Sequence, residues 1–67
     1  MPRNRRDSAV ERYEVARDLT EAALEQYSLG NERFADRLVE RAARIDRSAV
    51  EEVVQELEED AAQRGEN

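Results

Sequence analysis

The chain has 67 residues and a formal net charge of −6, from 17 acidic residues against 11 basic ones, all of them arginine. It contains no Cys and no His, which excludes disulfides, thiolate nucleophiles, imidazole bases and the usual zinc sites. Its length allows a single domain, and its aromatic content of 4% is too small to line a sizeable cofactor pocket.

Hydrophobic periodicity predicts helices and no strands. The first predicted helix runs from about residue 8 to residue 29. Ser8 and Glu11 have the spacing of a capping box at its start, and Gly30 suits the left-handed position after its last turn. Residues 1–7 are expected to form a disordered basic arm, and residues 63–67 a disordered tail. The apolar stripe of this helix comprises Ala9, Tyr13, Ala16, Leu19, Thr20, Ala23, Leu24 and Tyr27.

Two further helices are predicted, at about residues 31–45 and 47–62. Either Asp46 or Ser48 can cap the last of them. Short connections at Gly30 and Asp46 predict an all-α fold, a compact three-helix bundle over residues 8–62 with tight corners. The stripes of these two helices comprise Phe34, Ala35, Leu38, Val39, Ala42, Ile45, Val50, Val53, Val54, Leu57 and Ala61.

The predicted core is thin. Each large apolar side chain contributes about 1.5–3 kcal/mol when fully buried, and each ordered residue costs about 1.5 kcal/mol of conformational entropy. At this length the two sums nearly cancel, so small domains usually need a disulfide, a metal or a partner. Because the residues for the first two are missing, we expect a homo-oligomer or a complex with a larger protein.

Two groups of residues are candidates for partner binding. Val15, Ala22 and Leu29 recur every seven residues beside the main stripe, and they either widen the core face or form a second apolar seam for another helix. The last third of the chain carries most of the excess negative charge. Its carboxylates form a solvated face, a partner-docking surface or, least favoured, a metal site. The candidates for docking are Glu52, Glu56 and Glu59.

Arginines line one side of the second predicted helix at Arg33, Arg37, Arg41 and Arg44. Three interpretations are open: ion pairing with neighbouring acids, such as Glu40 with Arg44, contact with an acidic protein, or contact with nucleic-acid phosphates. The first is favoured, because a chain of charge −6 is repelled by nucleic acid.

Residues 38–50, together with Val53, Val54 and Leu57, resemble the core of a helix-turn-helix, as found in bacterial and archaeal winged-helix regulators. The resemblance covers about 20 of the 67 residues. Arg44 stands where the turn usually has glycine, and the wing strands are absent. The resemblance implies, as an alternative, a small DNA-binding transcription regulator. Its nucleic-acid contacts would be Arg3, Arg5, Arg6, Arg33, Arg37, Arg41, Arg44, Arg47 and Gln55.

The residue inventory argues against catalysis and membrane insertion. The Ser and Thr hydroxyls have no His or Lys to activate them. No apolar run approaches the roughly 20 residues of a membrane span or the roughly 7–15 of a signal-peptide core. We therefore expect a cytoplasmic, non-enzymatic protein-protein interaction module or accessory subunit. It would use its apolar helix faces and its acidic last helix, with no cofactor, metal, membrane or small-molecule substrate.

Overall fold

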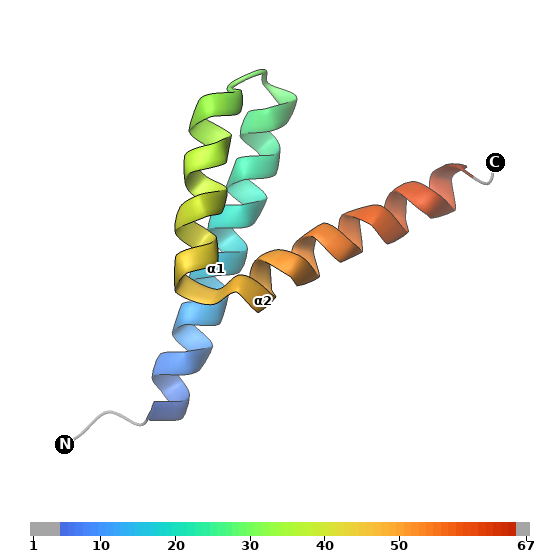
Figure 1. Cartoon of the computed structure of the whole chain (residues 1–67). Coiled ribbons are helices and arrows are strands. Elements are labelled where there is room, and N and C mark those ends of the chain that lie inside the picture. Colours follow the sequence, from blue (N-terminus) through green and yellow to red (C-terminus); the bar gives the residue numbers. More distant parts are fainter. Residues whose placement is uncertain (1–4, 66–67) are drawn as a thin grey trace.

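A computed structural model describes residues 5–65 and shows two helices joined by a short loop (Figure 1). Helix α1 spans Arg5–Ser28 and helix α2 spans Glu32–Gly65. The two run antiparallel and form a helical hairpin. The all-α class expected from the sequence is confirmed.

The prediction of three helices is wrong, because the expected corner at Asp46 is a kink inside α2. Asp46 has an extended backbone, with φ −161° and ψ 99°, while the residues on both sides are helical. Its carboxylate oxygen Oδ1 accepts hydrogen bonds from the Ser48 hydroxyl at 2.6 Å and from the Ala49 amide at 3.3 Å. This cap starts the next turn at once, so a single residue changes the direction of α2 without a separate loop.

We call residues 47–65, the part of α2 after the kink, the arm. Figure 1 shows the arm leaving one end of the hairpin and projecting away from it. The molecule is accordingly elongated, with principal extents of 53 × 27 × 13 Å. The bundle corner expected at residue 46 therefore becomes the base of a projecting helix.

The helices also extend beyond their predicted ends. Helix α1 begins at Arg5, ahead of the expected cap at Ser8, and the arm continues to Gly65. The backbone of residues 5–7 and 63–65 is thus helical where disorder was predicted. The rest of the predicted arm and tail, residues 1–4 and 66–67, lies outside the described residues.

The connection between α1 and α2 is a glycine-capped turn, as predicted. Gly30 has φ +87°, a left-handed conformation that costs glycine little. The Asn31 amide donates to the Gln26 carbonyl at 2.9 Å, and the Gly30 amide donates to the Tyr27 carbonyl at 3.0 Å. This is the bonding pattern of a Schellman motif, which satisfies the last carbonyls of α1 and reverses the chain.

Small side chains form the line of contact between the helices. Among residues 8–64, whose side chains the structure describes, five alanines are fully buried, Thr20 is 1% exposed and Val53 is 4% exposed. The Thr20 hydroxyl donates to the Ala16 carbonyl at 2.8 Å, so its polar group is satisfied inside α1. Side chains of this size let two helix axes approach closely. The five alanines are Ala16 and Ala23 on α1 and Ala35, Ala42 and Ala49 on α2.

Several large side chains that the sequence placed in the core lie outside it instead. Tyr27 is 38% exposed, Phe34 51%, Val54 40% and Leu57 48%. The physical reason is the alanine contact line, because it brings the helices together at positions that leave no room for large side chains between them. The larger residues of each stripe are left at the edges of the hairpin and on the arm.

Candidate interaction surfaces

One flank of the hairpin is apolar and partly open. Val15 on α1 and Ile45 on α2 line the same pocket, which fixes this flank as a shared surface of both helices. Val15 is 48% exposed and Leu29 is 65% exposed. Phe34 and Leu38 lie eleven and seven residues before Ile45 and so share its side of α2. The apolar flank comprises Val15, Ala22, Leu29, Phe34, Leu38 and Ile45.

The three residues predicted to form a second seam on α1 therefore lie together on this flank. Val15 and Leu29 are exposed and Ala22 is half-buried. The surface is wider than the seam predicted from α1 alone, because α2 contributes a parallel line of side chains.

The arm has its own apolar line. Val50, Val54, Leu57 and Ala61 follow one another at spacings of four, three and four residues, so they share one side of the helix. We call these four residues the arm stripe. Val50 packs against the alanine core, whereas Val54, Leu57 and Ala61 are exposed. The stripe thus starts in the core and continues onto a projecting, uncovered surface.

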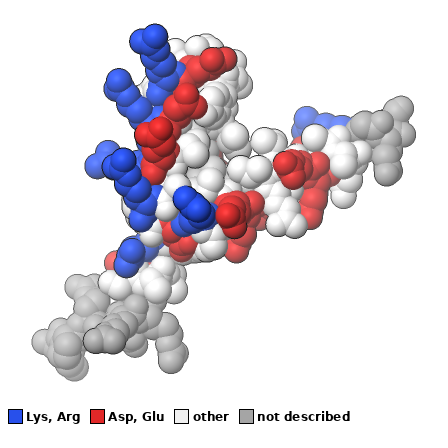
Figure 2. All heavy atoms as spheres, viewed as in Figure 1, with Lys and Arg blue, Asp and Glu red and all other residues white. Residues whose placement is uncertain are grey.

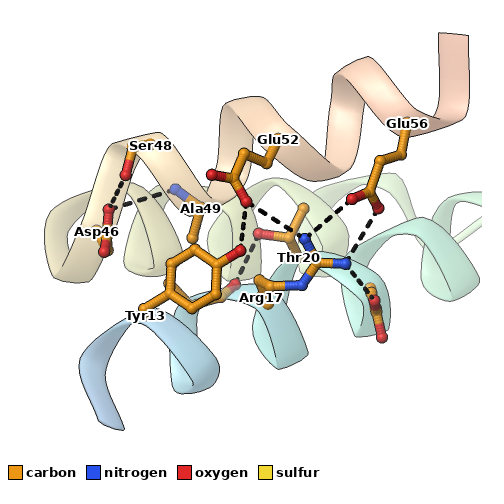
Figure 3. A network of polar contacts seen from close by, with 10 residues as sticks. Tyr13, Arg17, Thr20, Asp46, Ser48, Ala49, Glu52 and Glu56 are labelled. Carbon is orange, nitrogen blue, oxygen red and sulfur yellow. Dashed lines mark hydrogen bonds and ion pairs between the residues drawn. The ribbon is translucent and has the colours of Figure 1, made fainter. Parts of the chain in front are cut away.

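Arg17 attaches the base of the arm to α1 (Figure 3). Its guanidinium nitrogens lie 3.0 and 3.3 Å from the two carboxylate oxygens of Glu56, a bidentate pair. Glu52 lies 3.6 Å from the same guanidinium and Glu21 lies 3.5 Å from it. The hydroxyl of Tyr13 donates a hydrogen bond to Glu52.

These contacts change the acidity of the groups involved. The hydrogen bond from Arg17 lowers the pKa of Glu56 below its ordinary value. The hydrogen bond to Glu52 raises the pKa of Tyr13 above 10.0. Two of the carboxylates predicted to dock a partner, Glu52 and Glu56, thus contact α1 of their own chain. The third, Glu59, is exposed on the arm.

The arginines of the second predicted helix form an exposed ridge on the hairpin part of α2. We call Arg33, Arg37, Arg41 and Arg44 the arginine ridge. Among the side chains that the structure describes, these four make no ion pair within 4.0 Å, so the Glu40–Arg44 pair considered from the sequence is not formed. Figure 2 shows basic side chains along one edge of the hairpin, with acidic ones beside them and along the arm.

The residues of the DNA-binding alternative are distributed over α1, the hairpin part of α2 and the arm. Arg3 lies outside the described residues, and Arg5 and Arg6 lie in the first turn of α1. Arg47 and Gln55 are exposed on the arm, and the kink at Asp46 separates them along the chain from the arginine ridge. A helix-turn-helix joins its helices by a turn of three or four residues, whereas the resembling segment here bends at Asp46 alone.

No local sequence pattern indicated that Arg17 holds the arm, because its partner Glu56 is 39 residues away. The alanine contact line, in contrast, is marked by a repeat in the sequence. Ala35, Ala42 and Ala49 recur every seven residues, as do Ala16 and Ala23.

Across residues 5–65, no helix is both long enough and apolar enough to cross a membrane. Within the same range, no group of three or more acidic side chains is arranged to hold a metal ion. Comparison with known proteins finds no matching family model, and no curated protein or solved structure matches the chain.

Proposed function

We propose that this protein is a small, acidic, non-enzymatic protein-protein interaction module that binds through the apolar flank and the arm stripe. The observation that supports the proposal is that small apolar side chains lie inside the fold and large ones lie on its surface. Alanines fill the contact between the helices, while seven large apolar residues are 38–65% exposed.

The arrangement of these residues supports binding more than their number does. Single exposed apolar side chains are ordinary on protein surfaces, whereas continuous apolar patches mark interaction sites. Here five of the seven lie on the two defined surfaces, Val15, Leu29 and Phe34 on the flank and Val54 and Leu57 on the arm stripe. Surfaces of this kind are the ones through which amphipathic helices dock on partners.

Charge gives the proposed surfaces their selectivity. The arm carries Glu51, Glu58 and Asp60 near its apolar stripe and Glu59 on the opposite side, and the hairpin carries the arginine ridge. Opposite charges across an interface steer association and reject wrong partners. A partner of the arm is therefore expected to be basic around an apolar groove.

A pull-down from the source cell tests this proposal. The bait is the wild-type chain, compared with a double variant of the flank, Val15→Glu with Leu29→Glu. The matched control, Ala62→Glu with Gln63→Glu, adds the same charge at exposed arm positions outside the stripe. We expect one or a few proteins, this chain included, to be retained by the wild type and the control and lost from the flank variant. Equal recovery on all three baits would contradict the proposal.

A second candidate function, DNA binding, is favoured by one observation, the four exposed arginines of the ridge. Their guanidinium groups suit phosphates. A gel shift with random duplex DNA at low salt tests it. Non-specific binders have dissociation constants of roughly 10⁻⁴–10⁻⁶ M, and the affinity falls steeply with salt. A shift that the ridge variant Arg37→Glu abolishes would support this candidate, and no shift at about 100 µM protein would remove it.

A further inference from the structure

We infer that the partner of each surface is a second copy of this chain, with the arm stripe of one copy packed on the apolar flank of the other. The inference rests on the proposed function and identifies the partner that binds the two surfaces. A two-fold axis makes the contact reciprocal, so each copy gives an arm and receives one.

The two apolar surfaces match in form. The flank consists of one line of side chains from α1 and one from α2, and the two lines meet in a pocket beside Val15 and Ile45. Two apolar lines side by side suit a third, amphipathic helix. The exposed part of the arm stripe supplies anchors for such a contact at Val54, Leu57 and Ala61, at spacings of three and four residues. From Val15 to Leu29 the flank is about 21 Å long, and the arm is about 28 Å long.

The charges beside the two surfaces are opposite. The flank pocket is lined by two arginines and one carboxylate, Arg12, Arg44 and Glu11, together with Val15 and Ile45, so its charged lining is net positive. Arg44 also belongs to the arginine ridge. On the arm, Glu58 follows Leu57 and Asp60 precedes Ala61, so carboxylates border the stripe. An arm on the flank would place these carboxylates near the arginines. A copy of this chain therefore has the acidic, apolar helix that the flank requires.

The arm cannot cover the flank of its own chain. It is attached to α1 through Tyr13 and Arg17. Val15 is two residues from each of them, which places it about 160° around the helix. The flank and the attachment site are thus on nearly opposite sides of α1, and only another molecule can bring an arm to the flank.

Sedimentation velocity gives the first test. We expect wild-type chain to form a species of twice its 7.8 kDa mass as its concentration rises. Leu57→Glu should weaken dimerisation at least about tenfold, as expected for a central apolar anchor, and should still fold because Leu57 is half-exposed in one copy. The matched control Gln55→Glu adds the same charge about 160° around the arm from Leu57, away from the stripe, and should dimerise as the wild type does.

A disulfide trap identifies the two surfaces, because the natural chain has no Cys. Ala22→Cys and Leu57→Cys lie near the middle of the flank and of the arm stripe. The two variants are mixed with different mass tags, oxidised and analysed by mass spectrometry. We expect the mixed disulfide to dominate. Ser28→Cys, exposed on another side of α1, replaces Ala22→Cys as the control and should give little mixed product with Leu57→Cys.

Two results would overturn the inference. Dominant like-with-like disulfides would show a flank-to-flank or arm-to-arm dimer. A wild-type chain that stays monomeric over the whole concentration range would show that no second copy binds. If the pull-down still captured a different protein through the flank, the proposed function would stand without this inference. If it captured nothing, both would fail.

Discussion

At the scale of single residues, the main determinant of this fold is the size of the side chain at each contact position. Ala42 is fully buried among Ala16 and Ala49, where the two helices and the start of the arm meet. A methyl group fills each position, so the helices pack closely without large side chains. The same closeness leaves Phe34 and Leu29 outside.

Replacing Ala42 by Leu should therefore destabilise the hairpin. Three added methylene or methyl carbons have no space at a fully buried site, and overpacking typically costs about 1–3 kcal/mol. Urea unfolding followed by circular dichroism measures the change. Ala62→Leu, on the exposed side of the arm, is the control and should change the free energy of unfolding by less than about 0.5 kcal/mol. Equal stability of the two variants would contradict the alanine contact line.

At the scale of elements, the position of the arm depends on contacts between residues far apart in the sequence. Arg17 pairs with Glu56 and Glu52 across 39 and 35 residues, and Asp46 sets the direction change before them. The pairs are exposed, so each is weak by itself. Together with Val53, which is 4% exposed, they hold the base of the arm on α1.

Arg17→Ala should loosen the arm without unfolding the hairpin, because the alanine contact line does not involve this side chain. Hydrogen exchange is the measurement, and we expect faster exchange for arm amides and little change for those of residues 16–28. The control is Arg64→Ala, whose partner Asp60 lies on the arm itself. Slow exchange in the arm of the Arg17 variant would show that burial of Val53 alone holds the arm.

The attachment of the arm to α1 should also weaken at low pH and at high pH. The pKa of Glu56 is lowered in the folded chain, so its contribution is present above the ordinary value of about 4.3 and is lost as pH falls through the lowered pKa. The pKa of Tyr13 is raised, so its contribution is present below about 10 and is lost as pH rises through the raised pKa. Arm-amide exchange measured from pH 3 to pH 11, corrected for intrinsic rates, should be slowest between these limits. A flat profile would contradict the role of these two groups.

Sequence patterns predicted the helices and the turns better than the packing. Capping chemistry is local, so Gly30 and Asp46 were found at the positions where the chain changes direction. The number of helices was wrong because the Asp46 cap restarts the helix without a loop. The apolar stripes identified candidate contact residues but not which of them meet. The alanines form the contact between the helices, and Leu57 and Phe34 do not.

At the scale of the whole molecule, a hairpin with an alanine core buries little apolar surface per residue. The stabilisation from burial scales with apolar area, at roughly 25 cal/mol per Å², whereas the entropy cost scales with the number of ordered residues. The projecting arm adds ordered residues and, beyond Val53, little burial. Covering the flank and the arm stripe in a dimer would add the buried apolar area that the single chain lacks.

The concentration dependence of thermal unfolding tests this account most directly. Circular dichroism melts of the wild-type chain from a few micromolar to about 1 mM should show a midpoint that rises with concentration, because a bound second copy stabilises only the folded state. The Leu57→Glu variant should melt at a lower and constant midpoint. A sharp wild-type transition with the same midpoint at every concentration, shared by the variant, would contradict the account.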